Sequence, residues 1–449
     1  MKSLTFPRGI HPSEKKNTAH KPVVKLSPAV GELLTFPMSQ HIGAPAEPIV
    51  NVGDRVLLGQ KLGDSAQPLS SPVHSSVSGV VKSITQTLTP TGITCQAVIV
   101  ENDGEDNAVG NFAILDSGDQ SILADDGQTP DRDKVLQLIR EAGVVGLGGA
   151  GFPTHIKLNP PKEKAIDTII VNASECEPYL TTDHRAMLDE TERLISGLKI
   201  ILSLFPGAKG LIGVETNKAD AIEKLLKVAR NESDITIVPL KPKYPQGAEK
   251  QLIYTLTKRE VPSGGLPADI GCIVDNVDTV IAIERAVHRR RPLIRRVITV
   301  DGGAAKNPGN YEVRLGTSYS SLIEHSGGFV TPPCKLISGG PMMGVAMFTL
   351  DVPVTKTSSA ILCFTDKEAY LPPEKNCVRC GRCVDHCPAR LMPLELNQYV
   401  IAGEMDEFVA HNGKDCIECG SCSYVCPSKR HLAQSIRAAR RQALAAPRK

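Results

Sequence analysis

Eight of the 13 cysteines in this 449-residue chain are concentrated at residues 377–426. They form two runs of one pattern, with spacers of two, two and three residues and a proline after the fourth cysteine. Bacterial iron–sulfur proteins show this spacing: three thiolates of a run bind one cluster, and the fourth binds the neighbouring cluster. We therefore predict two [4Fe–4S] clusters. The first cysteine set is Cys377, Cys380, Cys383 and Cys426, and the second cysteine set is Cys387, Cys416, Cys419 and Cys422.

Two other interpretations of these cysteines are weaker. Structural zinc sites use paired C-x2-C units rather than two runs of four cysteines. A disulfide framework would spread its cysteines along the chain instead of placing them in one dense block. The five remaining cysteines are scattered, and we expect most of them to be small buried side chains.

A glycine-rich stretch, residues 146–151, is the second segment suited to chemistry. Gly146, Gly148 and Gly151 fit G-x-G-x-x-G, but a dinucleotide fingerprint needs a strand directly before it, and residues 131–142 have a helical pattern. Gly149 adds a further bare position, so the backbone N–H groups can approach a phosphate or a flat ring. Lys157 is placed to neutralise a phosphate. The alternative is a tight structural turn.

Polar loops follow two of the expected strands. Residues 165–173 form a short apolar strand pattern, and Asn172, Glu175 and Glu177 lie at its end, while Asn276 lies in a later loop. Ligands bind at the carboxyl ends of parallel strands. We expect these side chains to bind flavin edges or nucleotide riboses, whereas the alternative is a solvated loop with a helix cap.

The elements that must position these residues fall into separate regions. Residues 26–100 show short strands and turns typical of a small β-domain that resembles the barrel-sandwich fold of lipoyl carriers, without a lysine at a hairpin tip. Residues 101–130 have a linker composition. Helices and strands alternate over 131–290, which predicts an α/β layer with a parallel sheet. Residues 295–350 are β-rich, and 365–440 are helical around the cysteines.

Composition excludes several classes of protein. Lys+Arg 51 against Asp+Glu 49 leaves a net charge of +2, so no overall positive field favours nucleic acid. No apolar stretch reaches the roughly 18 residues that a membrane span needs, and residues 1–25 have no signal-peptide core. We expect a cytoplasmic protein. The final 21 residues contain seven basic side chains and no acidic one, which indicates either a solvated helix end or a contact with an anionic membrane surface.

Three segments together carry a family resemblance: GGAGFPTHIKL, VNASECEPYLTTDHR and VDNVDTV. They resemble the flavin- and NADH-binding subunit of respiratory complex I. With the N-terminal RGIHPSEKKNTAHKP, the ISGGPMMG stretch and the two cysteine runs, nearly all of 1–440 is similar to the C subunits of the Rnf complex, the ion-translocating ferredoxin:NAD oxidoreductase. Two features depart from the complex I protein: Val145 and Leu147 replace arginines of its loop, and it holds a single cluster.

The resemblance implies a multidomain α/β and β architecture. After an N-terminal extension at 1–25 would come the barrel-sandwich domain at 26–100, a Rossmann-like flavin domain at 131–290, a β-grasp module at 295–350, and a two-[4Fe–4S] ferredoxin-like domain at 365–440. It further implies non-covalent FMN and NADH. The implied FMN contacts are Gly146, Gly148, Gly149, Lys157, Asn172, Glu175 and Asn276, and the implied NADH contacts are Phe152 and Glu177.

The function implied is that of an electron-transfer subunit at the cytoplasmic face of the inner membrane. Hydride would be exchanged between NAD(H) and FMN, and single electrons would pass through the two clusters to other subunits, with ferredoxin an indirect partner. No acid–base side chain is required, so we name no catalytic residue. Two alternatives stay open: a flavin/iron–sulfur reductase of cobalamin-type cofactors, and a scaffold that holds clusters without nucleotide.

Overall fold

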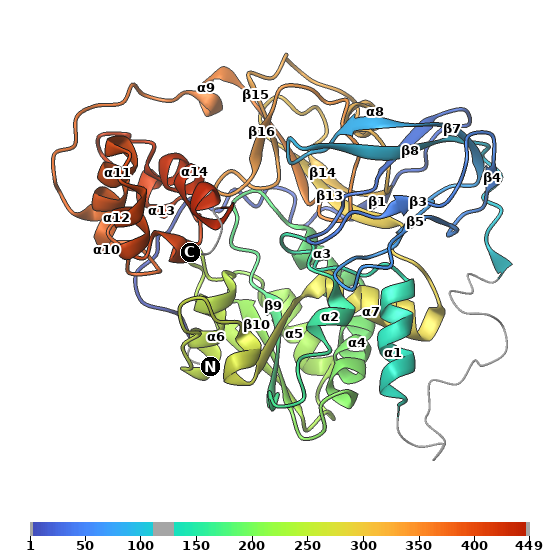
Figure 1. Ribbon diagram of the computed structural model, residues 1–449, viewed down its shortest axis with the longest axis horizontal. Coiled ribbons are helices and arrows are strands. Elements are labelled where there is room, and N and C mark those ends of the chain that lie inside the picture. Colours follow the sequence, from blue (N-terminus) through green and yellow to red (C-terminus); the bar gives the residue numbers. More distant parts are fainter. Residues whose placement is uncertain (1–2, 111–129, 446–449) are drawn as a thin grey trace.

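The computed structural model describes residues 3–110 and 130–445, so most of the predicted linker at 101–130 lies outside the described residues. Figure 1 shows the α/β domain in green beneath two β-rich domains, with the helical C-terminal domain in red to one side. The predicted four-part architecture is confirmed. No helix in the described ranges is long and apolar enough to cross a membrane.

The α/β domain is built on a parallel sheet with the strand order β11-β10-β9-β12. Alternate residues of the central strand β9 point to opposite faces: Ile169 and Val171 join one core, and Ile170 joins the other. Helices α1, α4 and α7 contribute to the first core, and α6 to the second. The strands are β9 (Thr168–Ala173), β10 (Lys209–Glu215), β11 (Ile235–Leu240) and β12 (Cys272–Asn276). The helices are α1 (Arg132–Glu141), α2 (Thr154–Lys157), α3 (Thr182–Asp189), α4 (Thr191–Ser203), α5 (Ala219–Val228), α6 (Glu249–Thr257), η2 (Pro267–Ile270) and α7 (Val277–Arg289).

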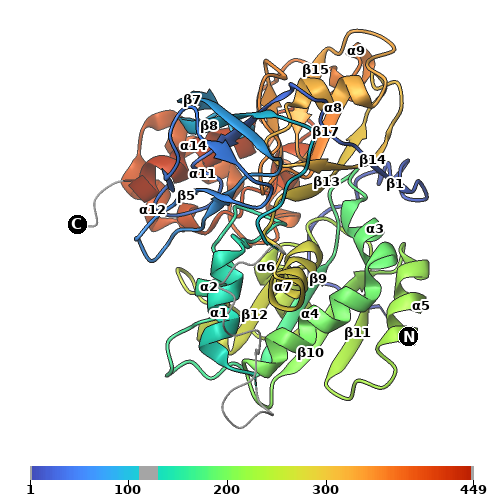
Figure 2. The same ribbon diagram turned by 90° about the vertical axis from the view of Figure 1, so that its right-hand side faces the viewer.

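The N-terminal β-domain consists of two small antiparallel sheets around an apolar core that includes Leu34, Phe36 and Val100. One sheet has the order β2-β8-β7-β4, and the other has the order β3-β5-β6. The strands are β2 (Leu33–Pro37), β3 (Glu47–Pro48), β4 (Arg55–Val56), β5 (Lys61–Asp64), β6 (Val73–His74), β7 (Gly79–Leu88) and β8 (Thr94–Asn102). This domain and the second β-rich domain both lie above α1 and α7 (Figure 2).

The second β-rich domain is one sheet with the order β1-β14-β13-β17-β15-β16 and the helix α8 (Tyr319–His325). Its strands are β1 (Val23–Lys25), β13 (Arg295–Asp301), β14 (Gly309–Arg314), β15 (Lys335–Ser338), β16 (Val345–Met347) and β17 (Ala360–Phe364). The sheet extends beyond the predicted range of 295–350, because β17 is fully buried and pairs in parallel with β13 at its centre. The sheet also takes in β1 from before the first β-domain.

The C-terminal domain shows an internal repeat that extends past the cysteines. Helices α10 (Arg382–Asp385) and α11 (Pro393–Ala402) recur 39 residues later as α13 (Ser421–Tyr424) and α14 (Leu432–Ala445). Between the two cysteine runs, α11 ends at Gly403, whose φ of +77° is left-handed. The remaining elements are α9 (Asp366–Ala369), α12 (Met405–Ala410) and η3 (Gly413–Asp415).

The predicted N-terminal extension is a strap that runs over several domains. Leu4 pairs with Leu240 at the edge of the α/β sheet. Arg8 then donates a hydrogen bond to the carbonyl of Val384 (3.0 Å) in the C-terminal domain. Farther along, the Lys16 ammonium donates to three carbonyls in the loop after β9, at 2.6–2.9 Å. The strap therefore links the α/β domain to the cysteine-bearing domain.

Candidate cofactor sites

The glycine-rich segment forms a loop between α1 and α2 whose two ends are hydrogen-bonded to each other. Val145 pairs with Pro153, and the Gly146 amide donates to the Phe152 carbonyl at 2.9 Å. The loop is fixed from outside at Leu147, whose amide donates to Thr279 Oγ1 (2.9 Å) and whose carbonyl accepts from Arg296 Nη2 (3.3 Å). Arg296 was not found from the sequence, because no short motif connects it to the loop, whereas Thr279 stands in the VDNVDTV segment that carried the resemblance.

Gly148 and Gly149 have different surroundings. A Cβ atom at Gly148 would lie 2.8–2.9 Å from side-chain atoms of Asn276, which is closer than ordinary van der Waals contact. A Cβ atom at Gly149 would meet nothing within 4 Å. Gly148 is therefore required for the fold of the loop, whereas Gly149 presents bare backbone to open space.

The two asparagines that were expected at the site shape its backbone. Asn276 caps α7, since its Oδ1 accepts from the Asp278 amide (3.0 Å), and its Nδ2 donates to Asp183 Oδ2 (2.8 Å). Asn172 Nδ2 donates to the Gly247 carbonyl at 2.8 Å, and its Oδ1 accepts from the Ser174 amide at 3.1 Å. The structure thus brings Asn276 against Gly148, two residues that the sequence predicted for one site.

Buried carboxylates lie beside this loop. Glu175 Oε1 accepts from the Asp183 amide (2.9 Å), while Glu175 Oε2 is buried and has no hydrogen-bond partner among the described residues. The nearest cation to Oε2 is the Lys16 ammonium, 4.0 Å away. Burial, followed by the charges of Glu175 and Asp278, raises the pKa of Asp183 to about 8. Asp183 can therefore retain a proton near neutral pH, and Glu175 Oε2 can accept a hydrogen bond from a ligand.

Lys157 differs from its expected role as a free cation. Its ammonium donates to the Val274 carbonyl (2.8 Å) and lies 3.3 Å from Asp275 Oδ1. Burial opposes its charge, but Asp275 prevails and raises the pKa of Lys157 above its usual range. Because its charge is already compensated by a buried carboxylate, Lys157 is not available as an unpaired partner for a phosphate.

Glu177 connects the loop after β9 to the second β-rich domain. Its carboxylate accepts from the backbone amides of Met342 (3.1 Å) and Met343 (2.9 Å). Gly340 allows this approach, since a Cβ there would lie 2.3 Å from the carboxylate. Burial raises the pKa of Glu177 to about 7. Phe152, the other expected NADH contact, is half-buried at the end of the glycine loop.

The two cysteine runs adopt the same backbone conformation. Arg379 and Glu418 occupy equivalent positions with φ of +54° and +57°, and each amide points at a cysteine sulfur 3.4 Å away, that of Cys377 or Cys416. N–H groups directed at sulfur are one of the features that set cluster potentials. Among the scattered cysteines, Cys272 is buried as expected but Cys334 is exposed.

The thiols that influence one another follow the crossed grouping. Burial raises the pKa of Cys383, and the two thiols that add to this effect, Cys377 and Cys426, belong to the first cysteine set. Burial also raises the pKa of Cys387, and Cys419 of the second set adds to it. In the described ranges no three His, Cys, Asp or Glu side chains converge as they would on one metal ion. Each thiolate of a cubane binds a different iron atom, so such convergence is not expected of its ligands.

The two sets differ in their exposure. Cys377 and Cys380 are exposed, and a groove of about 380 Å³ beside Cys426 is lined by Arg382, His386 and Lys429. By contrast, Cys419 is buried against the α/β domain.

Cys419 is joined to the α/β domain by a hydrogen bond: the buried Tyr244 hydroxyl donates to the Cys419 carbonyl (2.7 Å). Ile10 of the strap, Cys176 and Met342 pack into the same cluster. The second cysteine set therefore faces the candidate flavin site, and the first set faces outward.

Several basic side chains of the C-terminal segment form ion pairs within the molecule. Arg437 and Arg440 both pair with Glu418 at 2.8–2.9 Å. The buried face of α14, which includes Ile436, packs in one core with Cys387. Truncation after Ser428 would remove the α14 side of this core. Arg448 and Lys449 lie outside the described residues.

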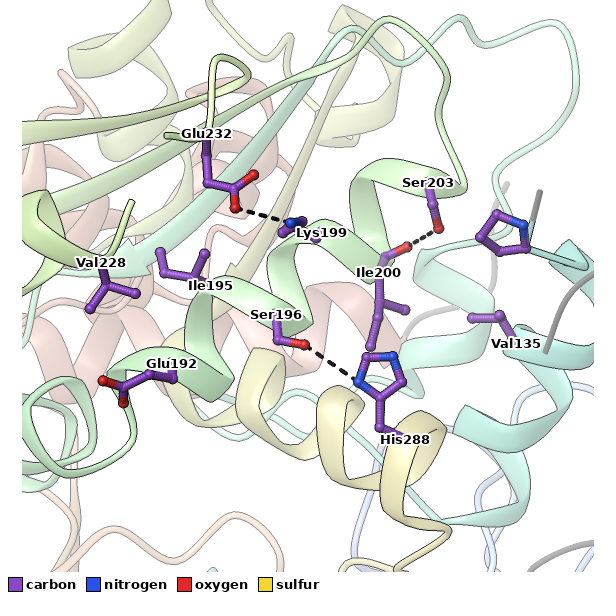
Figure 3. A pocket seen from close by; sticks show the side chains of 11 residues that line it. Val135, Glu192, Ile195, Ser196, Lys199, Ile200, Ser203, Val228, Glu232 and His288 are labelled. Atoms are coloured by element: carbon purple, nitrogen blue, oxygen red, sulfur yellow. Dashed lines mark hydrogen bonds and ion pairs between the residues drawn. The ribbon is translucent and has the colours of Figure 1, made fainter. Parts of the chain in front are cut away.

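A separate groove of about 490 Å³ lies between α1, α4 and α7 (Figure 3). Four of its polar side chains form two pairs: Lys199 with Glu232 at 2.9 Å, and Ser196 with His288 at 3.4 Å. None of the expected cofactor residues lines it, so it is distinct from the candidate site.

Comparison with known families defines the class of protein that this fold and these sites form. The family models that match are a Nuo51 FMN-binding domain at residues 139–285, an RnfC barrel sandwich hybrid domain at 4–105, an SLBB domain at 297–346 and a 4Fe-4S dicluster domain at 376–430. The chain is therefore a flavin-domain protein with an attached dicluster domain.

Two relatives narrow this class. The C subunit of the Na(+)-translocating ferredoxin:NAD(+) oxidoreductase complex of Acetobacterium woodii is 45% identical, over 100% of this chain and 99% of its own length. The C subunit of the proton-translocating ferredoxin:NAD(+) oxidoreductase complex of Clostridium ljungdahlii is 44% identical, over 90% of this chain and 85% of its own. The chain belongs to the family of C subunits of ion-translocating ferredoxin:NAD(+) oxidoreductase complexes. A solved NAD+-reducing [NiFe]-hydrogenase, in the H2-reduced state, matches with a TM-score of 0.49 and 19% identity, covering 70% of this chain and 62% of that chain.

Proposed function

We propose that this chain is the NAD(H)-linked electron-transfer subunit of a membrane-associated ferredoxin:NAD oxidoreductase complex. FMN, when bound, interconverts two-electron hydride chemistry and single-electron transfer. The observation that carries the proposal is the open glycine loop beside buried carboxylates in a domain of the FMN-binding class. The full-length relation to C subunits of such complexes favours this function over a cobalamin-type reductase.

We assign the flavin to the open side of the glycine loop. Gly146, Gly148 and Gly149 would supply backbone contacts, and Asn172, Glu175 and Asn276 would border the site. Glu175 Oε2 supports this, because a buried carboxylate oxygen without a hydrogen-bond partner is rare unless a ligand satisfies it. Lys157 would act through Asp275 and the β12 carbonyl rather than by direct charge. Phe152 and Glu177 would face NADH, with Glu177 held in place by two amides.

The cysteine sets would hold an inner and an outer cluster. The second cysteine set would hold the inner one, because Cys419 and Tyr244 place it against the α/β domain. The first set would hold the outer one, because its loop is exposed. The basic groove at Arg382 and Lys429 suits an acidic surface on another subunit of the complex. We place the chain on the cytoplasmic face of the membrane, held there by those subunits.

The flavin assignment can be tested at Gly149. A Cβ at Gly149 meets no described atom within 4 Å, so Gly149→Val should retain stability and iron but lose FMN, because its side chain would occupy the ligand's space. Gly110→Val is the matched control, since a Cβ at Gly110 also meets no described atom within 4 Å and Gly110 lies outside the site. Purified protein would be analysed for FMN, iron and thermal stability. Equal FMN content in both variants would contradict the assignment.

A second measurement distinguishes an electron-transfer subunit from a scaffold that holds clusters without binding nucleotide. Anaerobic titration with NADH should bleach the visible absorbance of bound FMN and then that of the clusters. If FMN binds but NADH leaves it oxidised, the NAD(H)-linked function is wrong even though the flavin site is right.

A further inference from the structure

Lys356 is a fully buried lysine that plays no part in the proposed cofactor contacts. It lies between β16 and β17, in the second β-rich domain. Its ammonium donates to the Pro72 carbonyl (2.6 Å), the Gly143 carbonyl (2.7 Å) and Ser71 Oγ (3.3 Å). None of these acceptors is a carboxylate. Burying an amine without a counter-ion is costly, so its position calls for a specific explanation.

The acceptors of Lys356 belong to different domains. Pro72 lies in the N-terminal β-domain, and Gly143 directly follows α1, three residues before the glycine loop. Gly143 has a φ of +68°, and a Cβ there would lie 2.7 Å from the Pro72 carbonyl and 2.9 Å from the Lys356 ammonium. One side chain thus joins three domains at the entry to the loop.

The exit of the loop is held by the same segment. The Lys356 amide donates to Gln40 Oε1 (3.0 Å). A Cβ at Gly151 would lie 3.0 Å from both the Gln40 carbonyl and Thr357 Cγ2, and the Gly151 carbonyl accepts from the Ile42 amide (3.2 Å). Residues 356–357 and 40–42 therefore pack on the end of the loop opposite to Gly143.

The middle of the loop depends on a neighbour of Lys356. Arg296, which donates to the Leu147 carbonyl, also donates from Nε to the Ser358 carbonyl (3.0 Å). Residues 356–358 are consequently linked to the loop at its entry, its centre and its exit. A lysine supplies three donors and no acceptor, so it can satisfy buried carbonyls of two domains at once.

We propose that Lys356 is a positioning residue for the flavin: it fixes the glycine loop by docking both β-rich domains onto the entry of that loop. The inference rests on the proposed binding of FMN at residues 146–151. It gives the N-terminal β-domain, which lacks a displayed lysine for a swinging arm, a role in shaping the flavin site.

The test compares two variants, each of which removes a different contact between the two β-rich domains. Lys356→Met keeps an unbranched side chain, one atom shorter, and removes the three ammonium donors. Arg314→Met is the control, because Arg314 joins the two β-rich domains by donating to the Ser76 carbonyl (2.6 Å) and to Asp106, without any contact to the loop. FMN affinity would be measured by quenching of free FMN fluorescence on titration with full-length, iron-loaded protein, and the flavin midpoint potential by redox titration.

We expect Lys356→Met to bind FMN at least tenfold more weakly and to shift the midpoint potential of the bound fraction, because the loop amides are displaced. Arg314→Met should bind FMN within twofold of the unchanged protein, whatever its thermal stability. Unchanged FMN affinity and potential in Lys356→Met would overturn the inference, as would equal losses in both variants.

A milder variant covers the case in which Lys356→Met does not fold. Gln40→Leu removes the contact to the Lys356 amide together with the hydrogen bond from Gln40 Nε2 to the Pro37 carbonyl (3.0 Å). We expect a smaller loss of FMN affinity in the same direction; no loss would again overturn the inference. Failure of the proposed function is distinguishable, because the unchanged protein itself would then show no saturable FMN binding.

Discussion

Replacing Gly148 with alanine tests the packing of the glycine loop against helix α7. The added Cβ would lie 2.8–2.9 Å from Asn276, so Asn276 must move. Overpacking costs about 1–3 kcal/mol, and the loss of the α7 cap adds about 1 kcal/mol. The lower backbone entropy of unfolded alanine returns about 0.4–1 kcal/mol. The expected net loss of unfolding free energy is about 2 kcal/mol.

Hydrogen exchange of flavin-free protein provides the assay. A loss of about 2 kcal/mol corresponds to roughly 30-fold faster exchange of the protected amides in α7. Gly149→Ala is the control, because its Cβ meets nothing and should leave exchange unchanged. Asn276→Gly removes the clash and still serves as a cap at a cost of a few tenths of a kcal/mol, but it also removes the hydrogen bond to Asp183. Rescue is therefore judged against Asn276→Gly alone: in that background, Gly148→Ala should leave exchange unchanged. Unchanged exchange in Gly148→Ala, or no rescue by Asn276→Gly, would refute this explanation.

Three other perturbations have defined outcomes. Cys387→Ala should abolish the electron paramagnetic resonance signal of the inner cluster and spare the outer one; loss of the outer signal alone would contradict crossed ligation. Lys218→Met should cost about 3–5 kcal/mol of unfolding free energy, because it leaves Glu215 buried without its 2.8 Å partner; a denaturant-unfolding loss below about 1 kcal/mol would contradict this. Burial lowers the pKa of Lys356 to about 7, so the unfolded state binds more protons between about pH 7 and 10.4. Stability should rise with pH across that window, and thermal unfolding of Lys356→Met should show a flatter profile; an unaltered profile would show that Lys356 is not the titrating group.

Local patterns in the sequence were sufficient for the elements they encode. The helical pattern at 131–142 corresponds to α1, which Asp131 caps. The expected strand at 165–173 corresponds to β9. The cysteine spacing alone predicts which thiols group together, and that grouping stays a prediction. In each case, the information lies within a few residues along the chain.

Contacts between distant segments could not be predicted in this way. The range predicted for the second β-rich domain ends at residue 350, before β17. The apolar run that forms β17 has only five residues, and its sequence does not show that it pairs with β13. The basic tail was counted as free charge, since nothing local to Arg437 shows that Glu418 lies beside it. Lys356 donates to carbonyls of residues more than 200 positions away in the sequence. Likewise, nothing near Lys157 in the sequence shows that Asp275 lies beside its ammonium.

The N-terminal strap has a consequence for how the protein is made. Arg8 leaves the ribosome before the flavin domain does, and its partner Val384 is synthesised 376 residues later. At roughly 5–20 residues per second, translation separates the two by roughly 20 to 75 seconds. The strap therefore cannot complete its contacts while the flavin domain folds. The strap reaches its native place only after the cysteine-bearing domain has emerged, so the joint between the two electron-carrying domains is completed after both domains have been synthesised.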